Sequence, residues 1–256
     1  MNLAVASCYH GPAMARTAGI ILIGNELLSG KVADANAVYL CRELRALGVD
    51  VRRIVVIPDE VERIAAEVTE FSRGFDVVFT SGGVGPTHDD VTIEGVARAF
   101  GVPVVRDPDM VAALEGFLGG HLNPARLRMA EIPEGAHPMT ADGLVFPAVV
   151  MHNVYVLPGV PELFRKKFDG LKEIFRDVPF HLASVFVNVG EGSLAEHLNG
   201  LLERHPELLL GSYPEFSNPE YRVKITLESK DRAYMERALE DFLGCLPVSS
   251  VVRVQR

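Results

Sequence analysis

The sequence predicts an α/β protein in which a doubly wound, mostly parallel sheet precedes a smaller α+β domain. Three observations predict it. Short apolar runs alternate with helical patterns as far as residue 177, and the order then changes to β-α-β-β-α-β. The composition, 48% hydrophobic and 23% charged over 256 residues, is that of a globular protein and excludes a disordered chain or a coiled coil. We therefore divide the chain into an extension over 1–15, a first domain over 16–177 and a second over 178–256.

The first domain alternates strands and helices. Ala18–Ile23 is a short apolar run, typical of a strand buried on both faces. Asp34–Leu47 has apolar residues at near-helical spacing and stops before Gly48, a residue expected just past a helix end. The later elements are, in order, a strand over Val49–Ile57, a helix to Phe71 opened by a capping box of Asp59 and Glu62, a strand over Asp76–Thr80, a helix to Phe100, helices over Asp107–Leu118 and Asn123–Ala130, a hairpin of Val149–Met151 and Val154–Leu157, and a helix to Phe175.

The second domain has a different order of elements. Its expected elements are a strand over Phe180–Val189, a helix over Ser193–Arg204, strands over Leu208–Tyr213 and Tyr221–Ser229, a helix over Asp231–Leu243 and a strand over Val248–Val254. This β-α-β-β-α-β order is that of the split βαβ, or ferredoxin-like, unit.

Charge and cysteine content narrow the classes of partner. Lys and Arg number 25 against 34 Asp and Glu, a formal charge of −9, so the chain lacks the basic surface of a general nucleic-acid binder. Three scattered cysteines are too few for a disulfide framework or a structural zinc site, which favours reduced thiols and a cytoplasmic location. No apolar run approaches the roughly 18 residues of a membrane span, and residues 1–13 lack a signal-peptide pattern. We expect neither nucleic-acid nor membrane partners.

The strongest functional signal is the glycine-rich stretch from Ser81 to Asp90, which follows a buried strand and leads into a helix. In open α/β sheets, ligands bind in the crevice at the carboxyl ends of the strands. Glycines there let backbone N–H groups approach an anion, and the helix N-terminus adds unpaired donors. The ligand this predicts is a phosphate or diphosphate, and its candidate contacts are Ser81, Gly82, Gly83, Gly85, Pro86 and Thr87.

Two carboxylates beside this loop, Asp89 and Asp90, predict a divalent cation, because they would otherwise repel a bound phosphate. The alternative is structural: Thr87 and Asp90 match a capping pattern, so that Asp90 caps the next helix and Asp89 is the freer candidate ligand. Adjacent helical residues face different ways, which argues against both carboxylates holding one ion. His88 either assists a proton transfer or faces solvent.

A second loop, Gly24 to Gly30, leaves the first predicted strand and is expected at the same edge of the sheet. Glu26 is a candidate metal ligand or a contact for a ribose hydroxyl. Further candidate contacts with a phosphate or a ring are Gly24, Asn25, Ser29 and Asn36. The alternative is a tight turn in which Asp34 is the N-cap of the following helix.

A third loop, Pro158-Gly159-Val160-Pro161, also follows an apolar strand and opens a helix. Gly159 permits a close approach of a ligand, with Pro158 and Pro161 as neighbouring contacts. The alternative is an ordinary helix start, because proline is common at the first helical position.

Together these loops resemble the molybdopterin-binding, MogA/MoaB-like domain in its CinA (competence/damage-inducible protein) branch. The stretches that carry the resemblance are Gly24–Gly30 with Asn36, Tyr39–Arg42, Pro58–Val61, Gly82–Thr92, Leu157–Pro161, Leu210–Pro214 and Tyr221–Ser229. Within this branch the sequence is most similar to the N-terminal molybdopterin-binding-like domain of eukaryotic FAD synthase. The resemblance extends from residue 17 to residue 254 and adds Thr92 to the candidate contacts.

The resemblance implies a MogA-like pocket that takes a pterin or a nucleotide. Relatives hydrolyse pyrophosphate bonds, in ADP-ribose or in FAD to give FMN and AMP, with divalent ions such as Co²⁺. We therefore expect a pyrophosphatase dependent on Co²⁺, Mn²⁺ or Mg²⁺, with Asp89, Asp90 and Glu26 as metal ligands and catalytic residues. The alternatives are a non-catalytic molybdopterin- or nucleotide-binding module and a molybdopterin adenylyltransferase-like enzyme. A homo-oligomer is also expected, as in related proteins.

The sequence departs from these relatives in two respects. Where the CinA branch carries Gly-Thr-Ala-Pro-Gly before the last sheet strand, the stretch from Asp142 to Pro147 differs, which implies altered substrate choice. The sequence also contains neither the nucleotidyl-transferase domain of FAD synthase nor the deamidase domain of CinA. We expect neither FAD synthesis nor deamidation of nicotinamide mononucleotide.

Overall fold

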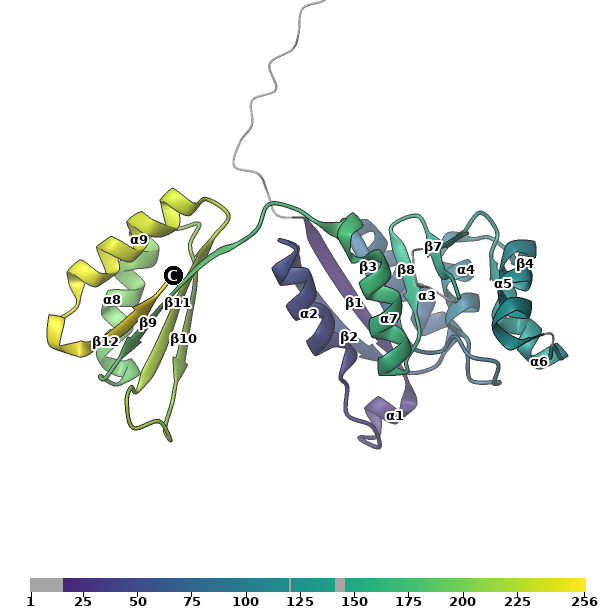
Figure 1. The fold of residues 1–256 in the computed structure, drawn as a ribbon, viewed down its shortest axis with the longest axis horizontal. Coiled ribbons are helices and arrows are strands. Elements are labelled where there is room, and N and C mark those ends of the chain that lie inside the picture. The colour runs from purple at the N-terminus through teal and green to yellow at the C-terminus, as the bar shows by residue number, and fades with distance from the viewer. Residues whose placement is uncertain (1–15, 120, 141–145) are drawn as a thin grey trace, which may run out of the picture. The chain divides into compact units, whose positions relative to one another are not determined.

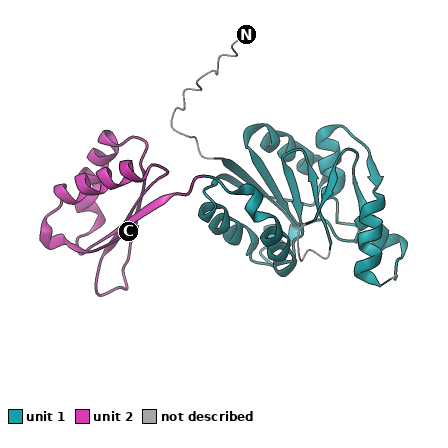
Figure 2. Ribbon diagram, turned by 45° about the horizontal axis from the view of Figure 1, so that its top comes forward, with its two compact units in different colours: residues 1–177 teal, residues 178–256 magenta. Residues whose placement is uncertain are grey.

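The fold is described from a computed structural model, which covers residues 16–119, 121–140 and 146–256. The predicted extension over 1–15 and most of the departing stretch, residues 142–145, lie outside the described residues. The described chain falls into two compact units that meet between Asp177 and Val178 (Figure 2). Each unit is described by itself.

The first unit is built on a six-stranded sheet of order β2-β1-β3-β8-β7-β6 (Figure 1). Four neighbouring strands are parallel, and the other two run antiparallel to their neighbours. The prediction of a mostly parallel sheet is therefore confirmed. The strands are β1 (Thr17–Ile23), β2 (Asp50–Ile57), β3 (Val77–Ser81), β6 (His137–Met139), β7 (Ala148–Met151) and β8 (Val154–Leu157).

Helices cover both faces of this sheet, as a doubly wound fold requires. Alternate residues of β1 point to opposite faces: Ile20 and Leu22 pack with α2 (Asn36–Ala46) and α7 (Pro161–Leu171), and Ile21 and Ile23 pack with helices of the other face. The helices of that other face are α3 (Val61–Gly74), α4 (Thr92–Phe100) and α5 (Pro108–Leu118). These buried layers fix the strand ends at which the site lies.

Several short elements of the first unit were not predicted. A two-stranded sheet pairs β4 (Val104–Arg106) with β5 (Glu131–Pro133), and β6 adds an edge strand of three residues. Three residues are too few for a period of two to show in the sequence. The short helix α1 (Asn25–Leu28) was not predicted either. The predicted helix over Asn123–Ala130 is found as α6 (Pro124–Leu127) followed by the 3₁₀ helix η1 (Arg128–Ala130), and the predicted helix to Phe175 as α7 followed by the 3₁₀ helix η2 (Lys172–Phe175).

The predicted capping box at Asp59 is wrong. Helix α3 begins at Val61, and the residue before it, Glu60, makes no side-chain cap. Asp59 Oδ2 instead accepts a hydrogen bond of 2.8 Å from the backbone N–H of Asn25. The carboxylate thus satisfies a donor of the loop after β1 and ties that loop to the end of β2.

The chain order places a crevice at one edge of the sheet. From β1 the chain moves to β2 on one side of it and then to β3 on the other. Loops that leave parallel strands on the two sides of such a reversal diverge and leave room for a ligand. The loops after β1, β3 and β8 all leave the same edge, because these strands are parallel.

The second unit has the predicted ferredoxin-like order. Its antiparallel sheet runs β10-β11-β9-β12, and α8 (Glu191–Arg204) and α9 (Arg232–Cys245) pack on a core of their own. Its strands are β9 (His181–Val187), β10 (Leu209–Pro214), β11 (Val223–Ser229) and β12 (Val251–Gln255). The 3₁₀ helix η3 (Val248–Ser250) directly precedes β12. Neither unit, in its described residues, contains a helix long and apolar enough to cross a membrane.

Candidate functional site

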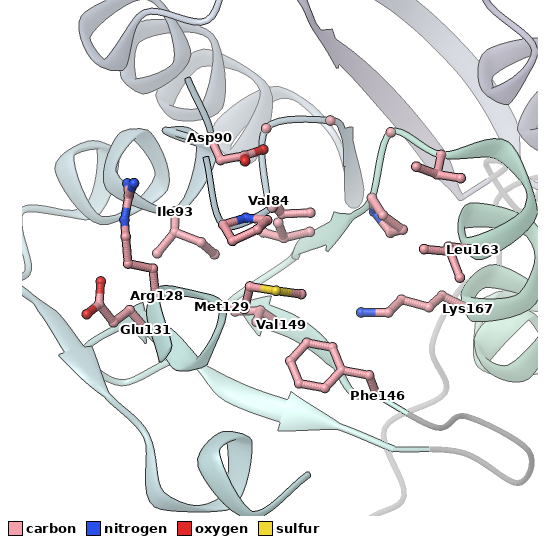
Figure 3. A pocket seen from close by; sticks show the side chains of 18 of the residues that line it. Val84, Asp90, Ile93, Arg128, Met129, Glu131, Phe146, Val149, Leu163 and Lys167 are labelled. Carbon is pink, nitrogen blue, oxygen red and sulfur yellow. The ribbon is translucent and has the colours of Figure 1, made fainter. Parts of the chain in front are cut away.

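A cavity of about 630 Å³ lies at the carboxyl ends of β3 and β8 (Figure 3). The glycine loop after β3 and the loop after β8 form one part of its wall. Of the predicted site residues, the cavity is lined by Glu26, Gly82, Gly83, Gly85, Pro86, Asp90, Pro158, Gly159 and Pro161. The structure therefore brings residues of all three predicted loops to one cavity.

Two glycines give the loop after β3 its path. Gly82 has φ +109°, and a Cβ there would lie 2.1 Å from the carbonyl oxygen of Ile23. Gly83 has φ +64°, and a Cβ there would lie 2.4 Å from Thr92 Oγ1. Thr92 Oγ1 itself donates to Gly82 O at 2.8 Å, and Thr92 does not line the cavity.

Asn36 holds two of the loops together. It is buried at the start of α2, and its Nδ2 donates to Ser81 Oγ at 2.9 Å and to Gly159 O at 2.8 Å. The Gly159 carbonyl fixes the amide orientation, because a carbonyl accepts only from the nitrogen. Neither Asn36 nor Ser81 lines the cavity, so both act beneath the loops that do.

Asp90 closes the glycine loop and does not cap α4. Its Oδ2 accepts from the backbone N–H of Thr87 at 2.8 Å and from Thr87 Oγ1 at 2.5 Å. Helix α4 begins at Thr92, after a residue that makes no side-chain cap. The capping alternative for Asp90 is therefore wrong. Arg128 supports the same turn by donating to Thr87 O at 2.9 Å.

The three predicted metal ligands differ in their positions. Glu26 and Asp90 line the cavity, whereas the Asp89 side chain is 62% exposed and does not. Among the described residues no group of three or more His, Cys, Asp or Glu is arranged to hold a metal ion.

The first loop contributes Glu26 alone among its predicted contacts. Gly24 N–H donates to Ile57 O at 3.1 Å, and Ser29 Oγ to Glu26 O at 3.3 Å, so both serve the turn itself. Asn25 is held by Asp59, and Asp34 accepts from the first N–H groups of α2, as predicted for a cap. The carboxylate of Glu26 lies over Gly24, where a Cβ would come within 2.5 Å of Oε1.

Several lining residues were missed by sequence reasoning. The basic ones are Arg128, Lys166 and Lys167. The apolar ones include Val84, Ile93, Met110, Phe117, Met129, Phe146, Val149, Val156 and Leu163. Met110 carried a signal, because it lies on the apolar stripe of a predicted helix. Phe146 lies in the stretch whose departure from the CinA pattern implied altered substrate choice, but no pattern there singled out this residue.

The cavity has two chemically different parts. Backbone groups of the glycine loop and the carboxylates Asp90 and Glu26 suit a phosphorylated group with a cation. A wide apolar wall, with Met129, Val149 and Phe146 in Figure 3, suits a flat ring system. Burial lowers the pKa of the Lys167 ammonium, at the far side of this wall, to about 8.

Comparisons with known proteins follow the division into two units. The family described as "Probable molybdopterin binding domain" matches residues 19–177, and the family described as "FAD synthase, middle domain" matches residues 179–255. A protein of Archaeoglobus fulgidus is 35% identical over 87% of this chain and 95% of its own length. The "Probable FAD synthase" of Caenorhabditis briggsae is 30% identical over 88% of this chain but 48% of its own length, so the chain spans about half of that relative.

A solved structure agrees with these matches. The protein CinA of Thermoplasma acidophilum, described as having unknown function, is 32% identical with a TM-score of 0.58, over 63% of this chain and 99% of that one. The molybdopterin-binding match alone covers more than half of the chain. The chain therefore belongs to the molybdopterin-binding, MogA/MoaB-like domain family, as its loops predict, and has a CinA protein and FAD synthases among its relatives.

Proposed function

We propose that this chain is a metal-dependent pyrophosphatase that cleaves the diphosphate of a dinucleotide-like substrate such as FAD or ADP-ribose. The observation that carries the proposal is the make-up of one cavity, with a glycine loop and two carboxylates in one part and a wide apolar wall in another. The first suits a diphosphate and the second a flat ring. The FAD synthase names of two relatives, and the match to a FAD synthase middle domain, support a flavin nucleotide.

Of the three predicted metal ligands, Glu26 and Asp90 line the cavity, and we propose these two carboxylates as ligands of a divalent ion. Two carboxylates suffice where substrate phosphate oxygens and water complete the coordination, as is usual for Mg²⁺. Co²⁺ and Mn²⁺ are the other candidate ions. A bound cation would neutralise phosphate charge and lower the pKa of a bound water molecule. Asp89 is a further candidate ligand from the same loop, although it faces solvent.

The chain's own groups bind and orient the substrate. Backbone N–H groups of the glycine loop donate to the phosphate oxygens, and the Thr87–Asp90 hydrogen bonds keep that loop in one conformation. The apolar wall holds the ring and excludes bulk water. In the reaction, the oxygen of a water molecule bonds to one phosphorus atom, and the bond between that phosphorus and the bridging oxygen breaks. The other phosphate leaves with the bridging oxygen, so that FAD yields FMN and AMP.

A module that binds a pterin or a nucleotide without turnover is the second candidate. The observation that favours it is that the described residues hold no ready-made set of three metal ligands. In such a module Asp90 would serve only to close the loop.

Product analysis by chromatography distinguishes the two candidates. Metal-free protein is incubated with FAD and with ADP-ribose, with and without Co²⁺, Mn²⁺ or Mg²⁺. We expect products only with metal, and we expect Asp90→Asn to lower the rate about a hundredfold or more. Asp89→Asn should lower it less than about tenfold, because its side chain does not line the cavity, and a loss as large as that of Asp90→Asn would instead place Asp89 among the metal ligands. Binding of either compound without any product would leave the binding module as the function.

A further inference from the structure

One basic side chain in the cavity wall, that of Lys167, has no carboxylate partner among the residues that the structure describes. Lys167 Nζ donates to Pro147 O at 2.6 Å and lies 4.9 Å from the centroid of the Phe146 ring. Figure 3 shows the side chain extending from α7 toward Met129, with Nζ at its inner end. Within the described chain no ion pair joins this ammonium to a carboxylate, so its contacts are a carbonyl oxygen and an aromatic face.

Lys172, five residues further along the chain, shows the usual arrangement. Its Nζ lies 2.8 Å from Glu43 and 2.8 Å from Asp169, so that two carboxylates neutralise it near the surface. A more buried ammonium needs such compensation more, because removal from water disfavours an unpaired charge. The lowered pKa of Lys167, to about 8, has burial as its cause. The described residues therefore keep a costly charge in the cavity and supply no carboxylate to neutralise it.

We propose that Lys167 is a specificity-determining residue whose ammonium binds an anionic phosphate oxygen of the ligand. The inference deepens the proposed function, on which it rests for the class of ligand. Lys167 lines the same cavity as the glycine loop, and a phosphate group of a bound ligand would supply a counter-charge that the described residues do not. The other charged groups that line the cavity are Glu26, Asp90, Glu94, Arg128, Glu131 and Lys166.

Neither of the other two basic side chains that line the cavity, Arg128 and Lys166, is both half-buried and without a carboxylate partner in the described chain, as Lys167 is. Arg128 Nη2 lies 3.6 Å from Glu94, and its Nη1 donates to Thr87 O, so it already has a counter-charge. Lys166 is exposed to solvent, which screens its charge. Lys166 therefore provides a matched control of the same type, on the same helix and at the same cavity.

The binding test uses pairs of ligands that differ only in a phosphate: FMN against riboflavin, and AMP against adenosine. Affinities are measured by calorimetry for the full chain and for Lys167→Met and Lys166→Met. We expect Lys167→Met to weaken FMN and AMP about tenfold to a hundredfold and to leave riboflavin and adenosine unchanged. Lys166→Met should change none of them more than about threefold. Equal weakening of both members of a pair, or equal effects of the two variants, would overturn the inference.

A second measurement needs no ligand. The pKa of Lys167 is about 8 in the folded protein against 10.5 in its ordinary state, so the unfolded chain binds more protons between these values. Burial of Lys167 therefore costs stability below pH 8, and this cost falls as the pH rises toward 10.5. We expect Lys167→Met to have a higher Tm than the wild type at pH 7, with a gain that shrinks by pH 10, and Lys166→Met to show no such gain.

The affinity measurement and the Tm measurement together distinguish a failure of this inference from a failure of the proposed function. If Lys167→Met brings no gain in Tm, the ammonium is not held at a cost and the inference fails. If Lys167→Met weakens the binding of FMN and AMP but not of riboflavin and adenosine, and the wild type cleaves neither FAD nor ADP-ribose, only the pyrophosphatase proposal fails.

Discussion

At the scale of single residues, Gly82 fixes the path of the glycine loop. Its φ of +109° disfavours any side chain, and a Cβ would meet the Ile23 carbonyl at 2.1 Å. We expect Gly82→Ala to destabilise the protein by about 2–5 kcal/mol, measured by urea unfolding, and to abolish ligand binding. Gly30→Ala is the control: φ is +69°, but nothing lies within 4 Å, so only about 1 kcal/mol of backbone strain is expected. Equal losses in the two variants would show that backbone strain, and not the Ile23 contact, dominates.

Asn36 joins the loops after β3 and β8 through its two hydrogen bonds to Ser81 and Gly159. Asn36→Ala leaves the Gly159 carbonyl without this donor, and we expect a loss of about 1–3 kcal/mol. Because the two loops line the cavity, we also expect FMN to bind at least about tenfold more weakly, measured by calorimetry.

Asn153 offers a matched control for that prediction. Its Nδ2 also donates twice, to Ser72 O at 3.0 Å and to Phe75 O at 2.9 Å, but at the amino end of β8, away from the cavity. Asn153→Ala should cost similar stability and leave the affinity for FMN unchanged. A weaker affinity in both variants would mean that general destabilisation, and not the junction of the loops, governs binding.

The residue scale also marks the limit of what the sequence predicts about the site. Glu26, Asp90 and Gly159 were found because each follows an apolar run that ends at the same sheet edge. Lys167 was not found from the sequence, because Lys166 and Lys167 are adjacent lysines in an amphipathic helix, a pattern that is typical of a solvated face. Only the packing of α7 distinguishes the half-buried Lys167 from the exposed Lys166. Asn36 was found as a polar residue near the site, but its role beneath the loops depends on contacts across 45 and 123 residues.

At the scale of elements, long periodic segments were predictable and short ones were not. The apolar run of β1 and the stripe of α2 each contain enough residues for their period to show. Strands β4 and β5 have three residues each and exist because they pair with each other. Asp59 shows the same limit at a helix start, because its carboxylate has a distant donor in Asn25 that a local capping rule does not consider.

At the scale of the whole molecule, each unit has its own core. The clusters around β1 contain only residues before 177, and the cluster around β9 and α9 only residues after 178. Phe164 in the first unit and Phe242 in the second are both fully buried. Replacement of either by alanine removes the same ring from a packed interior, which costs about 3–5 kcal/mol.

These separate cores predict separate local stabilities. We expect Phe242→Ala to speed amide hydrogen exchange in residues 178–256 and leave exchange in 16–177 unchanged, and Phe164→Ala to do the reverse, as read by mass spectrometry of peptides. FMN should protect only the first unit, in wild type and in Phe242→Ala alike, because the cavity is lined entirely by residues of that unit. Faster exchange in both units after either substitution would mean that the units unfold as one, and that stability of the second unit contributes to ligand binding in the first.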